Sequence, residues 1–365
     1  MKPNLAAMAE QFRFEGDFLD GGPCGFGHIN DTYAVRFGQA DGAIRRYALQ
    51  RINHDVFKNP KTLMQNIERV IAHLRERIAK AGGDPEREAL SLIPTLDGGV
   101  LYETGGEYWR AYAFIEGART FEVAASLDHV YNVSKAFGQF QKLLGDFPAE
   151  QLYETIPNFH HTGKRFEALV ATVERDARNR AQSVRAEIEF VEQRAEDVWI
   201  LVNLLERGEL PTRVIHNDTK FNNVMIDEET GEGVCVIDLD TVMPGLSLYD
   251  FGDSVRSGAN PAAEDEPDVS KVEMSLDIFD RLTHGYLDAA RDFLTPTEMD
   301  YLSFSARLIA FECGMRFLTD HLNGDVYFKV HRENHNLDRC RTQFKMVRDM
   351  EGKFERMEEV VARYR

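Results

Sequence analysis

The sequence predicts an α+β protein with two lobes, a small β-rich N-terminal lobe and a larger, mainly helical C-terminal lobe. Three observations lead to this fold class. Short segments rich in Phe, Tyr, Val and Ile, separated by glycine turns, occupy the first third of the chain. Apolar residues at three- and four-residue steps dominate the rest, and one β-rich island interrupts them at Arg213–Leu239. We place the lobes at residues 1–116 and 117–365 and expect a ligand site in the crevice between them.

The first lobe is expected to hold strands on both sides of one long helix. Apolar residues recur at helical steps from Leu63 to Ile78, which predicts a helix over Asn59–Ala81 that ends at the Gly82–Gly83 pair. The expected strands are Gln11–Gly22, Asn30–Phe37, Ile44–Asn53, Leu90–Leu96 and Tyr108–Ile115.

The second lobe is expected to be helical apart from the β-rich island. Its predicted helices are Ala124–Leu144, His161–Arg180, Ala181–Glu206, Lys271–Ala290, Thr297–Leu322 and Glu333–Tyr364.

The amino-acid composition and net charge argue against some classes of binding partner. The chain has 365 residues, with 43 Lys and Arg against 61 Asp and Glu, so its formal net charge is −18. With no basic surplus to neutralise phosphates, we expect neither nucleic-acid nor anionic-membrane binding. No apolar run approaches the roughly 18 residues of a membrane-spanning helix. The four cysteines are scattered without a Cys-x-x-Cys pair, which argues against a zinc site or a disulfide framework. A cytoplasmic enzyme is the simplest expectation.

The most informative stretch is a polar loop between apolar segments. Val214–Ile215 precedes the loop His216–Asn223, and a second apolar segment follows it. Soon afterwards the apolar run Val234–Ile237 ends in a carboxylate, Asp238. A hairpin that presents Asp218, Asn223 and Asp238 together is suited to metal-assisted phosphoryl transfer, because a carboxylate can accept the proton of an attacking hydroxyl while oxygen ligands hold Mg²⁺ on a triphosphate.

The loop His216–Asn223 resembles a known catalytic motif. Its spacing is that of His-Arg-Asp-x-x-x-x-Asn in protein kinases and His-Gly-Asp-x-x-x-x-Asn in small-molecule kinases, and Asp238 stands where the second, metal-binding Asp belongs. No Arg follows His216 and no Phe-Gly follows Asp238, so the chain is similar to the aminoglycoside phosphotransferase and choline kinase superfamily rather than to protein kinases. The resemblance implies a bilobal, protein-kinase-like fold.

Longer strings resemble one group within that superfamily, the N-acetylhexosamine 1-kinases. These strings run from the first lobe almost to the C-terminus and cover residues 49–53, 216–227, 236–245, 249–253 and 335–339. The resemblance implies ATP as co-substrate, Mg²⁺ as cofactor, and a small neutral sugar as acceptor.

The resemblance implies roles for the loop residues. Asp218 would be the catalytic base, and Asn223 and Asp238 would bind Mg²⁺. Lys220 would neutralise charge on the γ-phosphate. We interpret His216 as a structural brace of the loop, since an imidazole at this place in the motif hydrogen-bonds to the backbone.

The nucleotide phosphates are expected to meet the glycine-rich loop and the third strand. Gly25 and Gly27 lie in Gly21–Tyr33, where relatives fold a loop over the phosphates and where an ordinary β-turn is the alternative. Kinases usually carry a Lys on the third strand, whereas this chain has Gln50 at that register and Arg51 beside it. Because side chains alternate along a strand, only one of the two can face the cleft.

The adenine ring is expected at the end of the first lobe. The run Trp109–Gly117 reads as its last strand leading into the hinge, so the backbone groups of Phe114, Ile115 and Glu116 would bind the adenine edge.

The acceptor is expected near Asp238 and the late helices. Thr241 follows the Asp-Leu-Asp turn and could bind a sugar hydroxyl, or it could cap the turn. Arg316 is the one charge in the apolar run Cys313–Leu318 and needs an acceptor partner, either on the sugar or on Glu312 one helical turn earlier. The acidic residues Asp250 and Asp253 are interpreted as loop braces.

Together these features predict ATP- and Mg-dependent phosphorylation of the anomeric hydroxyl of N-acetylglucosamine or N-acetylgalactosamine. The alternative within the enzyme class is a kinase of the same superfamily acting on choline, homoserine, methylthioribose or an aminoglycoside. The alternative from another class is a catalytically inactive nucleotide-binding module, which the missing strand lysine would fit and the intact Asp218, Asn223 and Asp238 oppose.

Overall fold

The computed structural model describes residues 3–25 and 29–365, and these residues form two compact units. The first unit consists of Met1–Glu122, Asp146–Ile156 and Asn222–Met243. The second consists of Val123–Gly145, Pro157–Phe221 and Pro244–Arg365. The first is built mainly on β-sheets and the second mainly on helices, so the predicted α+β fold class is confirmed.

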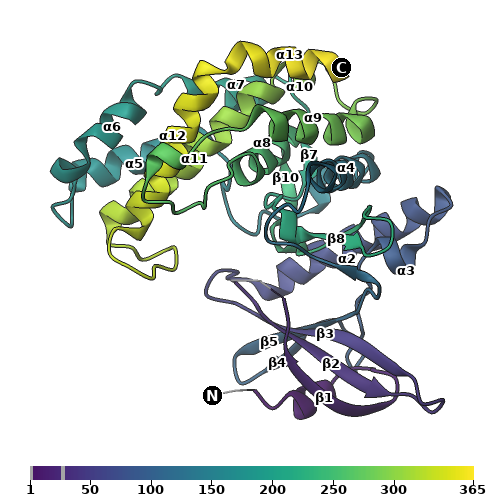
Figure 1. Ribbon diagram of the computed structural model, residues 1–365. Coiled ribbons are helices and arrows are strands. Elements are labelled where there is room, and N and C mark those ends of the chain that lie inside the picture. The colour runs from purple at the N-terminus through teal and green to yellow at the C-terminus, as the bar shows by residue number, and fades with distance from the viewer. Residues whose placement is uncertain (1–2, 26–28) are drawn as a thin grey trace. The chain divides into compact units, whose positions relative to one another are not determined.

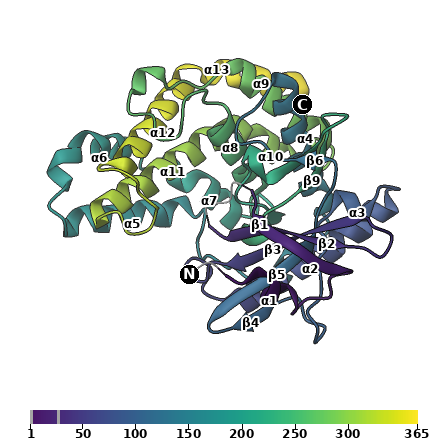
Figure 2. The same cartoon turned by 60° about the horizontal axis from the view of Figure 1, so that its bottom comes forward.

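A five-stranded antiparallel sheet forms the body of the first unit, with the strand order β1-β2-β3-β5-β4 (Figure 1, Figure 2). Apolar side chains on one face of the sheet pack into a core that includes Val35, Leu49 and Trp109. A second, three-stranded sheet has the order β6-β8-β9. The strands are β1 (Asp17–Pro23), β2 (Asp31–Gly38), β3 (Ile44–Ile52), β4 (Tyr102–Thr104), β5 (Glu107–Ala113), β6 (Ala118–Arg119), β8 (Val224–Asp227) and β9 (Gly233–Val236).

The long helix of this unit, α2 (Pro60–Lys80), confirms the predicted helix. The side chain of Asn59 caps it by accepting the N–H of Thr62, and the fixed φ of Pro60 suits its first turn. Its apolar face, from Leu63 to Ile78, is buried. Two short helices complete the unit, α1 (Leu5–Ala9) and α3 (Pro85–Glu88).

The predicted strand Leu90–Leu96 is wrong as a regular strand. Only isolated bridges form there, from Leu92 to Tyr112 and from Thr95 to Phe12. Pro94 has no N–H to donate, and the chain turns directly afterwards, where the Thr95 N–H donates to the Gly99 carbonyl.

Helices build the second unit, and α8, α11 and α12 lie side by side within it (Figure 1). The helices are α4 (Leu127–Leu143), α5 (Thr162–Arg175), α6 (Arg185–Glu192), α7 (Ile200–Glu206), α8 (Ser247–Gly258), α9 (Leu276–Ala290), α10 (Pro296–Asp300), α11 (Leu302–Asn323), α12 (His335–Gly352) and α13 (Phe354–Tyr364). Two short strands, β7 (Arg213–Ile215) and β10 (Met243–Gly245), pair with each other.

Three predicted helices are interrupted. The segment Thr297–Leu322 breaks at Tyr301 into α10 and α11. The segment Ala181–Glu206 breaks into α6 and α7, joined by a short 3₁₀ turn at Asp197–Trp199. The C-terminal helix breaks at Lys353 into α12 and α13. Among the described residues no helix has both the length and the apolarity needed to cross a bilayer.

Candidate active site

The loop His216–Lys220 follows β7 in the second unit and is held by two carboxylates of α8. Asp250 accepts the backbone N–H groups of His216 at 2.8 Å and Asn217 at 2.7 Å. Asp253 accepts the N–H of Thr219 at 2.9 Å. Since these bonds engage the backbone, they set the course of the loop whatever side chains it carries. The interpretation of Asp250 and Asp253 as loop braces agrees with this geometry.

Further buried groups hydrogen-bond to Asp250 and hold its carboxylate in place. Asp250 also accepts the Gln141 side-chain N–H at 2.8 Å, and the Tyr286 hydroxyl donates to Gln141 at 2.5 Å. Burial raises the pKa of Asp250. His216 is fully buried, and its Nδ1 accepts the N–H of Asp218 at 3.3 Å. The imidazole therefore braces the loop, as interpreted from the sequence.

The side chains of Asp218 and Lys220 meet on this loop. Lys220 Nζ lies 2.7 Å from Asp218 Oδ1. The charge of Asp218, with a further contribution from Asp253, raises the pKa of Lys220 despite its partial desolvation. The loop thus presents a carboxylate that can accept a proton beside a cation that stays charged, which is the pairing needed where a hydroxyl attacks a phosphoryl group.

Asn223 and Asp238 lie at the same end of the hairpin β8–β9 in the first unit. Asn223 directly precedes β8, and Asp238 comes two residues after β9. The N–H of Ile237 donates to the Asn223 carbonyl at 2.9 Å, so the two backbones are neighbours. Asp238 has a φ of 60°, a left-handed conformation that turns the chain sharply out of the strand.

This pair fits a magnesium site. Mg²⁺ is commonly bound through one or two protein oxygen ligands together with substrate phosphates. An Asn and an Asp at one hairpin end supply such oxygens, and Asp238 is only partly buried. In the described part of the chain no group of three or more His, Cys, Asp or Glu side chains could hold a metal by itself. Because Asp218 belongs to the other unit, its cooperation with this pair stays a prediction.

The predicted nucleotide residues of the first unit divide between two faces of the sheet. Gln50 hydrogen-bonds through both ends of its amide, donating to Thr32 Oγ1 at 2.9 Å and accepting from Arg110 Nε at 2.9 Å. Arg51, one residue on, pairs with Asp31 and with Glu107. Arg110 also pairs with Asp240, close after the hairpin β8–β9, so Gln50 is linked to the end of that hairpin. The two carboxylates that hold Arg51 belong to the sheet strands β2 and β5 instead.

The two predicted loop glycines have different outcomes. Gly25 has a φ of 82°, and a Cβ built on it would meet nothing within 4 Å, so its backbone is open to an approaching group. Gly27 lies outside the described residues.

The predicted hinge residues follow β5. The N–H of Phe114 donates to the Arg46 carbonyl at 3.3 Å. The Glu116 side chain pairs with Arg46, and its carbonyl accepts Arg87 at 2.7 Å. Within the described residues Ile115 makes no backbone hydrogen bond. The role of Phe114, Ile115 and Glu116 in adenine binding stays a prediction.

The predicted acceptor residues lie in different units. Thr241 is 8% exposed and belongs to the first unit, in the 3₁₀ turn Leu239–Thr241. Arg316, on α11, belongs to the second, where its guanidinium lies 4.8 Å from the ring centre of Phe159 and 5.7 Å from that of Phe328.

The alternative in which Arg316 pairs with Glu312 is wrong. Glu312 is almost fully buried and instead hydrogen-bonds to His160 Nδ1 at 2.8 Å. In the described residues Arg316 forms no ion pair, so its charge faces aromatic rings rather than a carboxylate.

Sequence reasoning missed one charged residue of this region, Arg110 on β5. It is 1% exposed and pairs with Asp240, which follows Asp238 by two residues. Its only signal in the sequence is that it interrupts an otherwise uncharged strand segment, Tyr108–Ala113.

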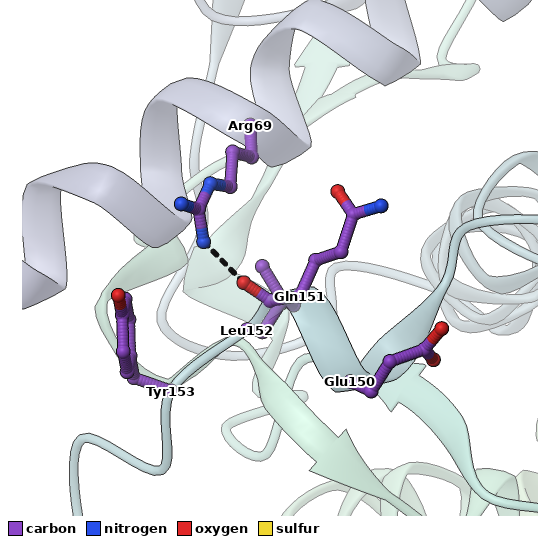
Figure 3. A pocket seen from close by; sticks show the side chains of 5 residues that line it. All are labelled: Arg69, Glu150, Gln151, Leu152 and Tyr153. Carbon is purple, nitrogen blue, oxygen red and sulfur yellow. Dashed lines mark hydrogen bonds between the residues drawn. The ribbon is translucent and has the colours of Figure 1, made fainter.

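A small cavity of the first unit contains none of the predicted site residues (Figure 3). Its volume is about 320 Å³, and it is lined by Arg69, Glu150, Gln151, Leu152 and Tyr153. Arg69 donates to the Gln151 carbonyl across it. We therefore assign the cavity no part in the site.

Comparison with known proteins adds a family and a fold. Residues 21–283 match the family described as the phosphotransferase enzyme family. Among solved structures, the chain is similar to an aminoglycoside phosphotransferase from Alicyclobacillus acidocaldarius subsp. acidocaldarius DSM 446, at 12% identity and a TM-score of 0.63, covering 100% of this chain and 97% of that one.

Two further structures are similar over nearly their whole length. One is a microcompartment-associated aminopropanol kinase, at 14% identity and a TM-score of 0.57, covering 96% of this chain and 98% of that one. The other is the amicoumacin kinase hAmiN in complex with AMP-PNP, Ca²⁺ and Ami, at 10% identity and a TM-score of 0.54, covering 96% and 92%. At these identities the likeness is one of fold.

Proposed function

Because the chain belongs to the phosphotransferase enzyme family, we propose that it transfers the γ-phosphate of ATP to the anomeric hydroxyl of an N-acetylhexosamine, N-acetylglucosamine or N-acetylgalactosamine. One observation carries the phosphoryl-transfer part. Asp218 sits beside Lys220 on a loop whose backbone two buried carboxylates hold, and the chain runs from that loop directly into the hairpin that places Asn223 next to Asp238. The sugar rests on the resemblance of the longer strings.

In this mechanism Asp218 takes the proton of the acceptor hydroxyl as its oxygen attacks the γ-phosphorus. The bond from the γ-phosphorus to the bridging oxygen breaks, and ADP leaves with that electron pair. An anomeric hydroxyl is more acidic than an ordinary sugar alcohol, so modest help from a carboxylate suffices. Lys220 balances negative charge, and most of the rate comes from alignment and charge neutralisation.

The metal would be held by Asn223 and Asp238. A bound Mg²⁺ neutralises phosphate charge and polarises the phosphoryl oxygens. The use of a nucleoside triphosphate with a divalent ion is supported by the similar amicoumacin kinase, whose structure contains AMP-PNP and Ca²⁺.

The charge around Arg316 favours a neutral acceptor over a cationic one. Arg165 donates to the Phe159 carbonyl at 2.8 Å, and Arg316 stands over the ring of the same Phe159. Both guanidinium groups thus contact Phe159, and burial and then the charge of Arg316 lower the pKa of Arg165. Two guanidinium groups repel an ammonium ion but can donate to the carbonyl of an N-acetyl group.

An amino alcohol remains the second candidate acceptor. The observation that favours it is the similarity in fold to the aminopropanol kinase over 96% of this chain. Such an acceptor needs carboxylates or aromatic faces around its ammonium group.

A coupled assay of ADP release tests these candidates against one another. The acceptors are N-acetylglucosamine, N-acetylgalactosamine, glucose, choline, aminopropanol, homoserine, methylthioribose and an aminoglycoside, with ³¹P NMR of the product. We expect turnover with the N-acetylhexosamines and a sugar 1-phosphate as product. Faster turnover with an amino alcohol would replace the proposed acceptor. ATP binding without ADP release for every acceptor would favour a catalytically inactive module.

A further inference from the structure

A buried hydrogen-bonded network surrounds Asp240, two residues after the candidate metal ligand Asp238. Asp240 is 2% exposed, and both of its carboxylate oxygens are engaged. Arg110 Nη1 donates to Oδ1 at 2.5 Å, and the Asn30 amide donates to Oδ2 at 2.5 Å. Arg110 Nε also donates to Gln50 Oε1 at 2.9 Å. The guanidinium thus spans from strand β3 to the turn that follows the hairpin.

The strand register explains why this cation stands where it does. Gln50 on β3 is directly opposite Arg110 on β5. Neighbours paired across an antiparallel sheet point to the same face, so both side chains reach the same side. Arg110 therefore lies on the face of the sheet that carries Gln50, and from there it reaches both Gln50 and Asp240.

The charges of Arg110 and Asp240 depend on each other. Two fully buried ions are costly to desolvate, and removal of either one leaves the other uncompensated. Burial by itself would lower the pKa of Arg110, but the charge of Asp240, with smaller contributions from Tyr112 and Asp238, raises it instead. Arg110 is thus a charged guanidinium whose carboxylate partner, Asp240, lies two residues after Asp238.

The same network fixes the backbone around Asp238. Asp240 and Thr241 form a 3₁₀ turn with Leu239, and Asp238 caps that turn in a left-handed conformation. On the other side, Asn30 accepts the N–H of Asn53 at 2.9 Å, which links the turn to the end of β3. A turn anchored on β3 and β5 in this way can hold Asp238 in one orientation.

We propose that Arg110 is the positioning residue of the metal-binding turn, and that it orients Asp238 through Asp240. This inference rests on the proposed function, since it assumes that Asp238 binds the metal of the nucleotide. It assigns Gln50 a different role from the one predicted. Gln50 holds Arg110 instead of gripping phosphate.

The test compares variants by nucleotide binding rather than by turnover. The affinity of the full-length protein for ATP is measured by titration calorimetry with Mg²⁺ and with EDTA, and thermal unfolding checks the fold. We expect Arg110→Met to weaken Mg-ATP binding by about 10- to 100-fold, as removal of a group that orients a metal ligand typically does. Binding of ATP in EDTA should change by less than about threefold, because Asp238 then has no ion to present.

A charge-transposed double variant, Gln50→Lys with Arg110→Gln, separates this role from a purely structural one. It returns one cation to the same pair of positions, so we expect it to recover most of the Mg-ATP affinity that Arg110→Met loses. The matched control is Arg51→Met on the opposite face of β3, which should leave the Mg²⁺ dependence unchanged. Equal losses with Mg²⁺ and with EDTA, or no recovery in the double variant, would overturn the proposal.

Two further measurements distinguish a folding defect from a loss of nucleotide binding. If Arg110→Met does not fold, the double variant Arg110→Gln with Asp240→Asn removes both charges together. A folded form of it with unchanged Mg-ATP affinity would also overturn the proposal. If the wild-type protein and Arg110→Met bind Mg-ATP equally well, the role of Arg110 is rejected and the proposed function is not. Wild-type protein that binds no nucleotide rejects the proposed function as well.

Discussion

At the scale of single residues, Asp218 has a neighbouring cation, and hydrogen bonds hold the backbone of its loop in place. Lys220 lies 2.7 Å away, and the loop backbone is bound by Asp250 and Asp253. Neither feature requires substrate, so the carboxylate is positioned before the acceptor arrives. Such preorganisation is what makes one carboxylate effective where the same group on a mobile loop would not be.

Asp218→Asn tests the role of this carboxylate as base. Asparagine has nearly the same shape but cannot accept the proton, so we expect kcat to fall by about 10²- to 10⁴-fold. ATP affinity, measured by calorimetry, should stay within a few fold because Asp218 is not assigned to the nucleotide. Retained turnover in this variant would remove the proposed mechanism.

Asp238→Ala should give the opposite pattern. It deletes an oxygen ligand of the metal, so Mg-ATP binding itself should weaken by about tenfold or more. The measurement is the same calorimetric titration, compared with titration in EDTA, where little change is expected. Equal affinity for Mg-ATP in wild type and variant would contradict the assignment of Asp238.

The residue scale also shows what a single sequence can and cannot reveal. The spacing from Asp218 to Asn223, and the apolar strand before Asp238, could be read directly because these residues are close along the chain. Arg110 could not be assigned in this way. Its partners are Gln50 and Asp240, 60 and 130 positions away. The register of β3 with β5 brings Gln50 to it, and the turn Leu239–Thr241 brings Asp240.

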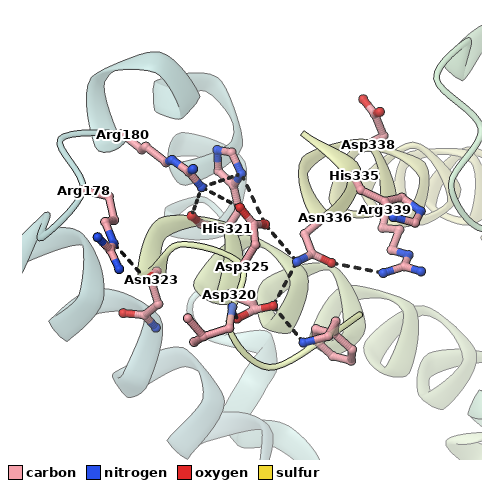
Figure 4. Close-up of polar contacts among 12 residues, drawn as sticks. Arg178, Arg180, Asp320, His321, Asn323, Asp325, His335, Asn336, Asp338 and Arg339 are labelled. Atoms are coloured by element: carbon pink, nitrogen blue, oxygen red, sulfur yellow. Dashed lines mark hydrogen bonds and ion pairs between the residues drawn. The ribbon is translucent and has the colours of Figure 1, made fainter. Parts of the chain in front are cut away.

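At the scale of elements, a carboxylate at the end of α11 orders the segment that follows it (Figure 4). Asp320 is 4% exposed and accepts the backbone N–H groups of Val326, Tyr327 and Phe328 at 2.8 to 3.0 Å. Asn336 of α12 donates to the same carboxylate at 2.9 Å. The ring of Phe328 then lies beside Arg316, so this network reaches the proposed acceptor site.

Asp320→Asn is expected to loosen this segment. An amide cannot accept as many backbone N–H groups, and hydrogen bonds to a charged group are worth about 1.5–3 kcal/mol each. We expect a loss of about 2 kcal/mol or more in the free energy of unfolding, and a KM for the acceptor that rises while the KM for ATP is unchanged.

Asp300→Asn is the matched control for that prediction. Its side chain is 52% exposed and pairs with Arg365 on the surface, so a change within about 0.5 kcal/mol is expected. If Asp320→Asn raises both KM values equally, the effect is a general loss of structure and the link to the acceptor site fails.

Two glycines let α4 and α9 approach closely in the second unit. A Cβ on Gly285 would lie 2.2 Å from the Tyr131 carbonyl oxygen, and one on Gly138 would lie 2.7 Å from that of Tyr286. Backbone atoms cannot move aside as a flexible side chain can. The periodicity of apolar residues predicted both helices but not this contact, because a helical pattern specifies a buried face and not its distance from the next helix.

Gly285→Ala should therefore destabilise the protein by about 1–3 kcal/mol or more, since the helices must move apart. Gly352→Ala, at the end of α12, provides the opposite case because a Cβ there would meet nothing within 4 Å. Alanine is the better helix former, so that variant should gain up to about 1 kcal/mol. Chemical denaturation measures both, and a stabilised Gly285→Ala variant would contradict the close packing.

At the scale of the whole molecule, the fold class could be predicted because period and composition change along the chain. Alternating apolar strands in the first third, then helical periodicity, distinguish a β-rich unit from a helical one before any contact is known. The places where prediction failed are local breaks. Pro94 interrupts a strand, and Lys353 separates two helices that share one continuous apolar pattern. Such breaks depend on what each segment packs against.

The first unit is assembled from three separate stretches of chain, and this has a consequence for fragments. A fragment of residues 1–122 contains all five strands of the larger sheet but lacks residues 146–156 and 222–243. Arg110 would lose Asp240, and buried Asn66 would lose its hydrogen bonds to the backbone of Tyr153. A buried charge without its partner costs about 3–5 kcal/mol, a large fraction of the stability of a small domain.

We therefore expect the fragment 1–122 to show no cooperative thermal transition by circular dichroism, and little dispersion in its ¹H–¹⁵N spectrum, under conditions where the full chain unfolds cooperatively. Arg110→Leu in the same fragment removes the unpaired charge and should restore part of the transition, because an apolar side chain suits the site that the guanidinium leaves. A cooperative, well-dispersed wild-type fragment would show that the sheet does not depend on the hairpin. The Asp240 network would then be an addition to a unit that folds without it.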